Sequence, residues 1–226
     1  MKKLITLMAG VVLSAGAHAA TVTFTDSFDL ATTNWTHLLG GSQFNAALGT
    51  LNSATFTFTD DIVQRIRGEN TGATPDTLTP LAGAQFQFRK SLATLMTTTL
   101  SAAGATFNAT AFDGVSDFAG TSGIDFGNIL ISATDTLTLT GGALASVIGT
   151  GTLGSAGYDV RALGQGAIQT GNGNLDSSIS TQARYNLTVV YDYTPTRSEV
   201  PLPGTLALMG GAFAALGMMR RKAIKA

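Results

Sequence analysis

The side chains able to do covalent chemistry are few in this 226-residue chain. It has no Cys, which excludes a thiolate nucleophile, a disulfide and a zinc–thiolate site. Its two histidines, His18 and His37, are too few for a multi-histidine metal centre. No Ser lies in a G-x-S-x-G elbow, and no H-E-x-x-H or phosphate-binding loop is present. We therefore expect a protein that is not an enzyme, with His37 near the start of a strand.

Paired carboxylates are the remaining candidates for acid–base work, because two of them can hydrolyse a glycoside. The candidate pairs are Asp26 with Asp29, Asp60 with Asp61, and Asp113 with Asp117. Each pair has turn-like neighbours, where Asp commonly bonds to the local backbone. A single Trp leaves little aromatic surface for stacking on sugars. We expect these acids to shape turns, and a hydrolase is the weaker alternative.

A Gly- and Asn-rich segment offers the best set of ligands for a cation. Asn172, Asn174 and Asp176 place oxygen-bearing side chains at alternate positions, as loops that bind a hard cation do. The closing Glu of an EF-hand is missing. The simpler alternative is a Gly/Asn β-hairpin turn. The sequence thus leaves a Ca²⁺ site open at these three residues and predicts no other cofactor.

The elements that position these residues are strands, because polar and apolar residues alternate with a period of two. The clearest alternating segments are 21–25, 54–59, 84–88, 134–140 and 185–193. The chain holds 34 Thr, a residue that suits the solvent face of a strand, and Gly-rich turns separate the segments. We predict an all-β fold, an antiparallel β-sandwich of jelly-roll or immunoglobulin-like type over residues 20–194, with a helical piece at 90–103.

The first nineteen residues are typical of a secretory signal peptide. Lys2 and Lys3 form a positive start, and a short apolar run follows. Ala17 and Ala19 make an A-x-A cleavage site, so the mature chain is expected to begin at Ala20. The apolar run is too short for a typical membrane-spanning helix.

The C-terminal end has the features of a membrane-spanning segment followed by a basic cluster. A polar linker at 195–199 precedes residues 202–219, which contain no charged residue. As a helix, these would measure about 27 Å, close to the thickness of a bilayer core. Arg220, Arg221 and Lys222 follow directly and favour a cytoplasmic end. We predict a transmembrane helix at 202–219 with a basic tail.

Residues 200–226 also carry the order of a sorting signal. Val200, Pro201, Leu202 and Pro203 precede the apolar span and the basic cluster. This arrangement resembles the PEP-CTERM class of signals of Gram-negative bacteria, in its Val-Pro-Leu-Pro variant. Leu202 stands where the usual motif has Glu. The resemblance implies recognition by an exosortase-like membrane protease.

Three body segments resemble the choice-of-anchor E domain family. They are Gln43–Leu51, Phe118–Thr121 and Tyr191–Pro195. The resemblance implies an extracellular domain joined to a sorting tail, and it carries no catalytic residue and no activity.

The first of these segments also has a simple interpretation from packing. Gly49 would allow a tight turn or a positive φ at the start of a strand. Phe44 and Leu48 would then anchor the preceding loop on the core.

The charges are segregated along the chain. All fourteen acidic residues but only seven of the thirteen basic ones lie within 20–199, which gives this body a net charge of −7. Such a charge argues against a nucleic-acid partner. We expect an exported protein that passes through the secretion machinery and is held transiently in the inner membrane. It would then reach the cell surface or matrix, with extracellular polysaccharide as a candidate partner.

Overall fold

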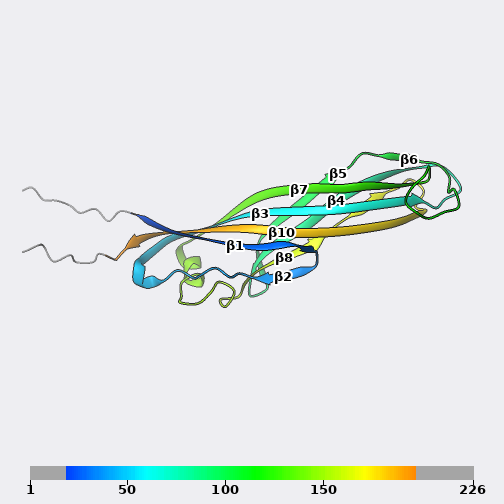
Figure 1. The fold of residues 1–226 in the computed structure, drawn as a ribbon. Helices are drawn as coiled ribbons and strands as arrows, with labels where there is room; N and C mark the ends of the chain where they lie inside the picture. Colours follow the sequence, from blue (N-terminus) through cyan, green and yellow to red (C-terminus); the bar gives the residue numbers. More distant parts are fainter. Residues whose placement is uncertain (1–18, 197–226) are drawn as a thin grey trace, which may run out of the picture. The chain divides into compact units, whose positions relative to one another are not determined.

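The computed structural model describes residues 19–196, which form two antiparallel β-sheets with only two short 3₁₀ helices (Figure 1). The all-β, antiparallel fold predicted from the sequence is therefore confirmed. Most of the predicted signal peptide, including Ala17, and the whole sorting signal, including Val200 to Pro203 and Arg220 to Lys222, lie outside the described residues.

The four-stranded sheet is built from the longest strands and has the order β1-β10-β3-β7. Its strands are β1 (Ala20–Thr32), β3 (Gly49–Asn70), β7 (Gly123–Thr140) and β10 (Leu175–Pro195). β3 and β10 pair along their whole length, from Leu175 opposite Asn70 to Pro195 opposite Gly49. At about 3.3 Å per residue, the 22 residues of β3 span about 70 Å. This central pair sets the long axis of the sandwich.

The second sheet has the order β2-β8-β4-β5. The short strands β6 and β9 pair with the N-terminal part of β4, and β8 pairs with its C-terminal part. Its strands are β2 (Trp35–Leu38), β4 (Asp76–Lys90), β5 (Ala93–Ala103), β6 (Phe107–Ala109), β8 (Tyr158–Gly164) and β9 (Ala167–Gln169). The 3₁₀ helices are η1 (Ala46–Leu48) and η2 (Gly141–Ser146). We refer to this sheet as the six-stranded sheet.

The period of two seen in the sequence is the burial pattern of the long strands. On β10 the side chains of Tyr185, Leu187, Val189 and Tyr191 are buried, as the sequence predicts. Tyr185 packs against Trp35 of the opposite sheet, with ring centres 6.1 Å apart, and the rings of Phe58 on β3 and Phe88 on β4 lie 4.9 Å apart. Burying large side chains of this kind contributes about 1.5–3 kcal/mol each, so the core needs no disulfide.

Threonine occupies the solvent face of the four-stranded sheet in matched pairs. Thr55, Thr57 and Thr59 on β3 face three threonines of β7, with hydroxyl-to-hydroxyl distances of 3.2, 3.4 and 3.1 Å. Cross-strand Thr pairs of this kind stabilise a sheet by about 0.2–1 kcal/mol each. These pairs account for six of the 34 Thr in the chain.

One buried polar side chain links the two sheets. Gln64, on the inward face of β3, accepts a hydrogen bond from the backbone N–H of Gly83 at 2.8 Å and donates to the hydroxyl of Thr181 at 2.5 Å. Its side chain is fully buried. Because an unpaired buried amide would cost about 1–3 kcal/mol, these bonds specify how β3 and β4 stack.

The helix predicted at 90–103 is wrong. Ser91 and Leu92 form a two-residue turn with φ values of 48° and 71°, and β5 then pairs back along β4. The residues of β5 alternate between the core and solvent, with Thr98 and Leu100 buried. Three consecutive Thr favour this extended form because they are β-branched.

The loop before β3 is partly as expected. Phe44 is buried in the core, and Gly49 has a φ of 151°. A Cβ at Gly49 would lie only 2.1 Å from the carbonyl oxygen of Thr194, so this position requires glycine. Leu48, however, is exposed, because η1 turns its side chain outward. The prediction that Leu48 anchors the loop is therefore wrong.

Within residues 19–196 no helix is long and apolar enough to cross a membrane. The predicted span at 202–219 lies outside this part of the chain.

Candidate functional site

Three loops gather at the end of the sandwich where β3 stops and β10 starts (Figure 1). They are residues 71–75, 110–122 and 170–174, and we call them the distal loops. The N–H of Phe112 donates to the carbonyl of Gly72 at 2.9 Å, and the N–H of Thr71 donates to the carbonyl of Asn174 at 3.0 Å. The distal loops lie at the opposite end of β10 from Pro195.

Glu69 holds the longest distal loop in place from beneath. It is completely buried, and its carboxylate accepts the hydroxyl of Ser122 at 2.5 Å and the N–H of Phe118 at 2.8 Å. A Cβ at position 123 would lie 1.9 Å from this carboxylate, which explains the glycine at Gly123. Burying a polar side chain of this kind costs free energy unless it has such hydrogen bonds.

The side chain of Asn70 joins two of the distal loops, 71–75 and 110–122. Its amide nitrogen donates to the carbonyls of Thr74 at 2.8 Å and Thr110 at 2.7 Å. Its amide oxygen accepts the N–H of Gly72 at 2.9 Å. The sequence singled out neither Asn70 nor Glu69, because their partners lie in distant segments and leave no local spacing pattern.

The predicted cation ligands lie in and just after the third distal loop. The side-chain oxygen of Asn172 accepts the N–H of Asn174 at 2.9 Å, and the carboxylate of Asp176 accepts the hydroxyl of Ser116 at 2.6 Å. In the part of the chain that the structure describes, no three His, Cys, Asp or Glu are grouped to hold a metal ion. The Ca²⁺ site at Asn172, Asn174 and Asp176 stays a prediction.

The alternative prediction for residues 170–174, a β-hairpin turn, is wrong. β9 pairs with β4 and β10 pairs with β3, so the loop passes from one sheet to the other. Asp76 holds its backbone, accepting the N–H groups of Gly171 at 2.9 Å and Asn172 at 3.2 Å. Desolvation raises the pKa of Asp76, but these N–H donors and that of Thr77 outweigh it and hold that pKa below its usual value.

Asp113 and Asp117 shape turns, as the sequence predicts. Asp113 accepts the N–H of Val115 at 3.0 Å, and Asp117 accepts the N–H of Ala119 at 2.9 Å. Each carboxylate therefore closes its own turn two residues further along the chain.

The turn-like setting expected for the other acid pairs is wrong, because they lie within β1 and β3. Asp60 points into the core and Asp61 points to solvent, where it pairs with Arg184 at 2.8 Å. Neighbouring residues on a strand face opposite sides of a sheet. Asp60 and Asp61 therefore cannot act together on one glycosidic bond.

His37 lies on β2, the strand expected for it, in a partly buried polar group. Its Nδ1 is 2.8 Å from the hydroxyl of Tyr185, and that hydroxyl donates to the carboxylate of Asp26 at 3.2 Å. Burial, and then the negative charge of Asp26, raise the pKa of Tyr185 far above its usual range. Tyr185 therefore stays protonated and bridges β1, β2 and β10.

A second buried polar group surrounds Asp60. The hydroxyl of Thr98 on β5 donates to the carboxylate of Asp135 on β7 at 2.5 Å. The contact of Thr98 with Asp60 lowers the pKa of Asp60. Burial has the larger, opposite effect and raises the pKa of Asp60 from 3.8 to about 7. Among the described residues, Oδ1 of Asp60 and Nε1 of Trp35 are the buried side-chain atoms without a hydrogen-bond partner.

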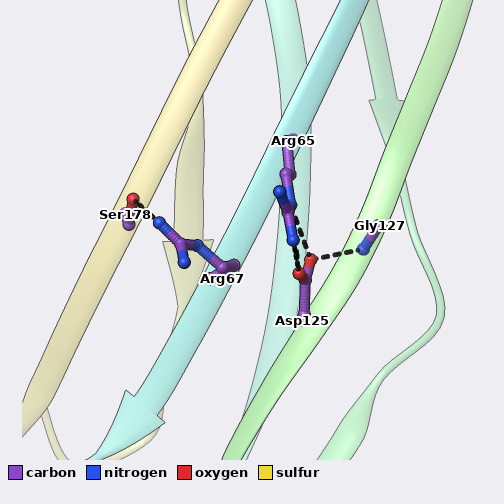
Figure 2. A network of polar contacts seen from close by, with 5 residues as sticks. All are labelled: Arg65, Arg67, Asp125, Gly127 and Ser178. Atoms are coloured by element: carbon purple, nitrogen blue, oxygen red, sulfur yellow. Dashed lines mark hydrogen bonds and ion pairs between the residues drawn. The ribbon is translucent and has the colours of Figure 1, made fainter. Parts of the chain in front are cut away.

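Figure 2 shows a network of polar contacts across β10, β3 and β7, made by Arg65, Arg67, Asp125, Gly127 and Ser178. Arg65 of β3 forms an ion pair with Asp125 of β7, and this guanidinium holds the pKa of Asp125 below its usual value. Arg67 donates to the hydroxyl of Ser178 at 2.9 Å, and its guanidinium lies 4.9 Å from the ring centre of Phe118. Arg67 thus fastens the 110–122 loop to β3.

Further along the solvent face of the four-stranded sheet lies a largely apolar hollow of about 350 Å³. Leu30, Val63 and Leu130 line it together with the ion pair of Asp61 and Arg184. Leu130 is 73% exposed, although it is a large apolar residue in the middle of a strand.

Comparison with known proteins assigns no family. No family model matches the sequence, and no curated protein matches it. Weak structural similarity exists to chains in structures of infectious bursal disease virus. The Gx strain structure is 11% identical, with a TM-score of 0.16, covering 84% of this chain and 42% of that one. The Gt strain structure is 11% identical, with a TM-score of 0.10 and coverage of 95% and 53%. This chain therefore spans about half the length of the chains it matches, and such scores assign neither function nor fold family.

Proposed function

We propose that this chain is an exported, non-enzymatic surface or matrix protein, delivered by a signal peptide and an exosortase-type sorting signal. The proposal rests on the residue patterns at the two ends of the chain. The described domain agrees with their placement, because β1 starts at Ala20, where the predicted signal peptide ends. β10 ends at Pro195, the first residue of the predicted linker. Within its sandwich class, a jelly-roll or immunoglobulin-like fold remains part of this proposal.

The structural observation that best fits the proposal is the pairing of the domain's two ends. Ala20 lies opposite Tyr193 in the ladder between β1 and β10, so the domain begins and ends side by side. The distal loops lie at the other end of β10, about 65 Å away along its 21 residues. A domain held through its C-terminal tail would present the distal loops farthest from its attachment point.

Mass spectrometry of the chain termini tests this route. The protein is expressed in its own host and recovered from membrane, surface and medium fractions. We expect the mature N-terminus at Ala20 and a C-terminus that has lost the basic cluster in the surface and medium fractions. A Pro201→Ala, Pro203→Ala variant should keep its tail and stay in the inner membrane. An intact 200–226 tail on every surface molecule would contradict the proposal.

The second candidate is a Ca²⁺- or carbohydrate-binding extracellular module. It is favoured by the oxygen-bearing side chains of Asn172, Asn174 and Asp176, which follow one another at the distal end. Calorimetric titration with Ca²⁺ should then release heat that a combined Asn172→Ala, Asp176→Ala variant abolishes, with Mg²⁺ as the comparison ion. The absence of both heat and a thermal shift at millimolar Ca²⁺ would dispose of this candidate.

A further inference from the structure

β7 is an edge strand whose free side is long and uniform. Within residues 19–196 its sheet ends at β7, and β3 is its one hydrogen-bonded neighbour. Half of the backbone N–H and C=O groups of its 18 residues therefore point away from the sheet. Such an edge is a template for pairing with another strand.

Most of the usual protections of an edge strand are missing from β7. Gly123–Thr140 contains no Lys, Arg or Pro. A register shift between the partners of Arg65 and Arg67 interrupts the ladder near the distal end. Asp135 points inward, where the hydroxyl of Thr98 binds it. Between these two features, residues 128–134 form an unprotected stretch.

The stretch from Asn128 to Thr134 has the composition of a strand that self-associates. It reads NILISAT, with no charge and no Pro, and it is rich in residues of high β-propensity. Leu130 on its solvent face is 73% exposed and adjoins the hollow lined by Leu30 and Val63. An exposed apolar residue of this size on an open edge marks an interaction surface.

This stretch is also complementary to itself in the antiparallel direction. With Ile131 placed opposite its own copy, Leu130 faces Ser132 and Asn128 faces Thr134. Residues opposite one another on antiparallel strands share a face, so Ile131 meets its own copy, Ile129 meets Ala133, and no charged pair forms. Two copies related by a two-fold axis use the same patch on both sides, which closes the assembly at two.

We propose that β7 of one copy pairs antiparallel with β7 of a second copy through residues 128–134, joining the two four-stranded sheets into one continuous sheet. The pairing is independent of the proposed sorting route. β1, the other edge of this sheet, is less suited to the role. Asp26 and Asp29 lie in its middle, where its ladder also shifts register between Phe28 and Ala31, whereas the two Asp of β7 lie outside residues 128–134.

Light scattering coupled to gel filtration tests the pairing on the full chain in a non-ionic detergent. We expect a dimer at micromolar concentration for the natural sequence. Leu130→Lys should raise the dissociation constant at least tenfold, because it sets two ammonium groups diagonally across the two-fold axis. Leu95→Lys, the same change on the edge strand of the six-stranded sheet, should leave the dimer unchanged. Circular dichroism and the melting temperature verify that both variants fold.

Amide hydrogen exchange supplies the second measurement. Amides of residues 128–134 should exchange more slowly at high than at low protein concentration, and Leu130→Lys should remove the difference. A monomer at all concentrations, oligomers larger than the dimer, or a dimer that survives Leu130→Lys would overturn the proposal. Persistence in that variant would place the contact elsewhere, including in the apolar C-terminal segment.

Discussion

The buried carboxyl group of Asp60 makes the stability of the sandwich depend on pH in an unusual direction. Its side chain is 1% exposed, and burial raises its pKa from 3.8 to about 7, with smaller contributions from the charges of Asp135 and Asp61. A carboxyl whose pKa is higher in the folded than in the unfolded state binds its proton more tightly when folded. Its contribution is fully present below about pH 4 and is lost as the pH rises through 7.

The size of the effect follows from the shift. A difference of about three pKa units corresponds to about 4 kcal/mol of unfolding free energy. That is a large fraction of the 5–15 kcal/mol typical of a domain. Asp125 also titrates, but its lowered pKa places its effect below about pH 4 and gives it the opposite sign. Among the described residues with a shifted pKa, Asp60 is the one whose pKa lies between 5 and 8.

Asp60→Asn keeps the shape of the side chain and removes its charge. We expect the unfolding free energy of the natural sequence to fall by about 3 kcal/mol from pH 5 to pH 8, and that of the variant to stay nearly level. Urea denaturation at constant ionic strength measures both. The variant should be the more stable of the two at pH 8.

Asp61→Asn provides the matched control, because Asp61 is the next residue but faces solvent. It loses the ion pair with Arg184, worth at most about 1 kcal/mol at the surface, and should keep the fall between pH 5 and 8. If the natural sequence and Asp60→Asn lose stability in parallel across this window, the reasoning from the burial of Asp60 is refuted.

Three further substitutions test packing and turns by urea denaturation. Gly49→Ala should lower the unfolding free energy by about 2 kcal/mol, because its Cβ would meet a backbone oxygen; an unchanged midpoint would show that this junction can move. Replacing Ser91 and Leu92 by Asn-Gly should raise it by about 1 kcal/mol, because both positions have positive φ, and a loss would argue against this turn. Arg89→Met should cost about 3–5 kcal/mol by leaving Asp159 buried without its partner at 2.6 Å. Adding Asp159→Leu should recover most of that loss, and failure to recover would assign the cost to packing instead.

Local alternation in the sequence was enough to predict a part of each of five strands, β1, β3, β4, β7 and β10. It works where one face is buried and the other is wet, as on β10 from Tyr185 to Tyr191. It fails to give the length of β3, because Asp60 and Gln64 occupy inward positions that a pattern of apolar residues would fill. Their partners lie on other strands, and the sequence alone does not show them.

The candidate site was predictable only in part, for a similar reason. Asn172 and Asn174 stand out because they are spaced along one short segment. Glu69 and Asp76 do more to build the distal loops, yet each acts on residues 49 or more positions away. The pairing of β10 with both β1 and β3 is equally non-local, so the partition into two sheets had no local signal.

The long central ladder has a mechanical consequence. A load applied between the distal loops and the residues after Pro195 would run along the axis of β10, which is hydrogen-bonded on both sides, to β1 and β3. Because ladder hydrogen bonds lie perpendicular to the strands, such a load shears many of them at once instead of opening them one by one. Pulling Ala20 away from Pro195 would instead peel β1 from the edge, pair by pair. The same domain would resist force strongly along one axis and weakly across its paired ends.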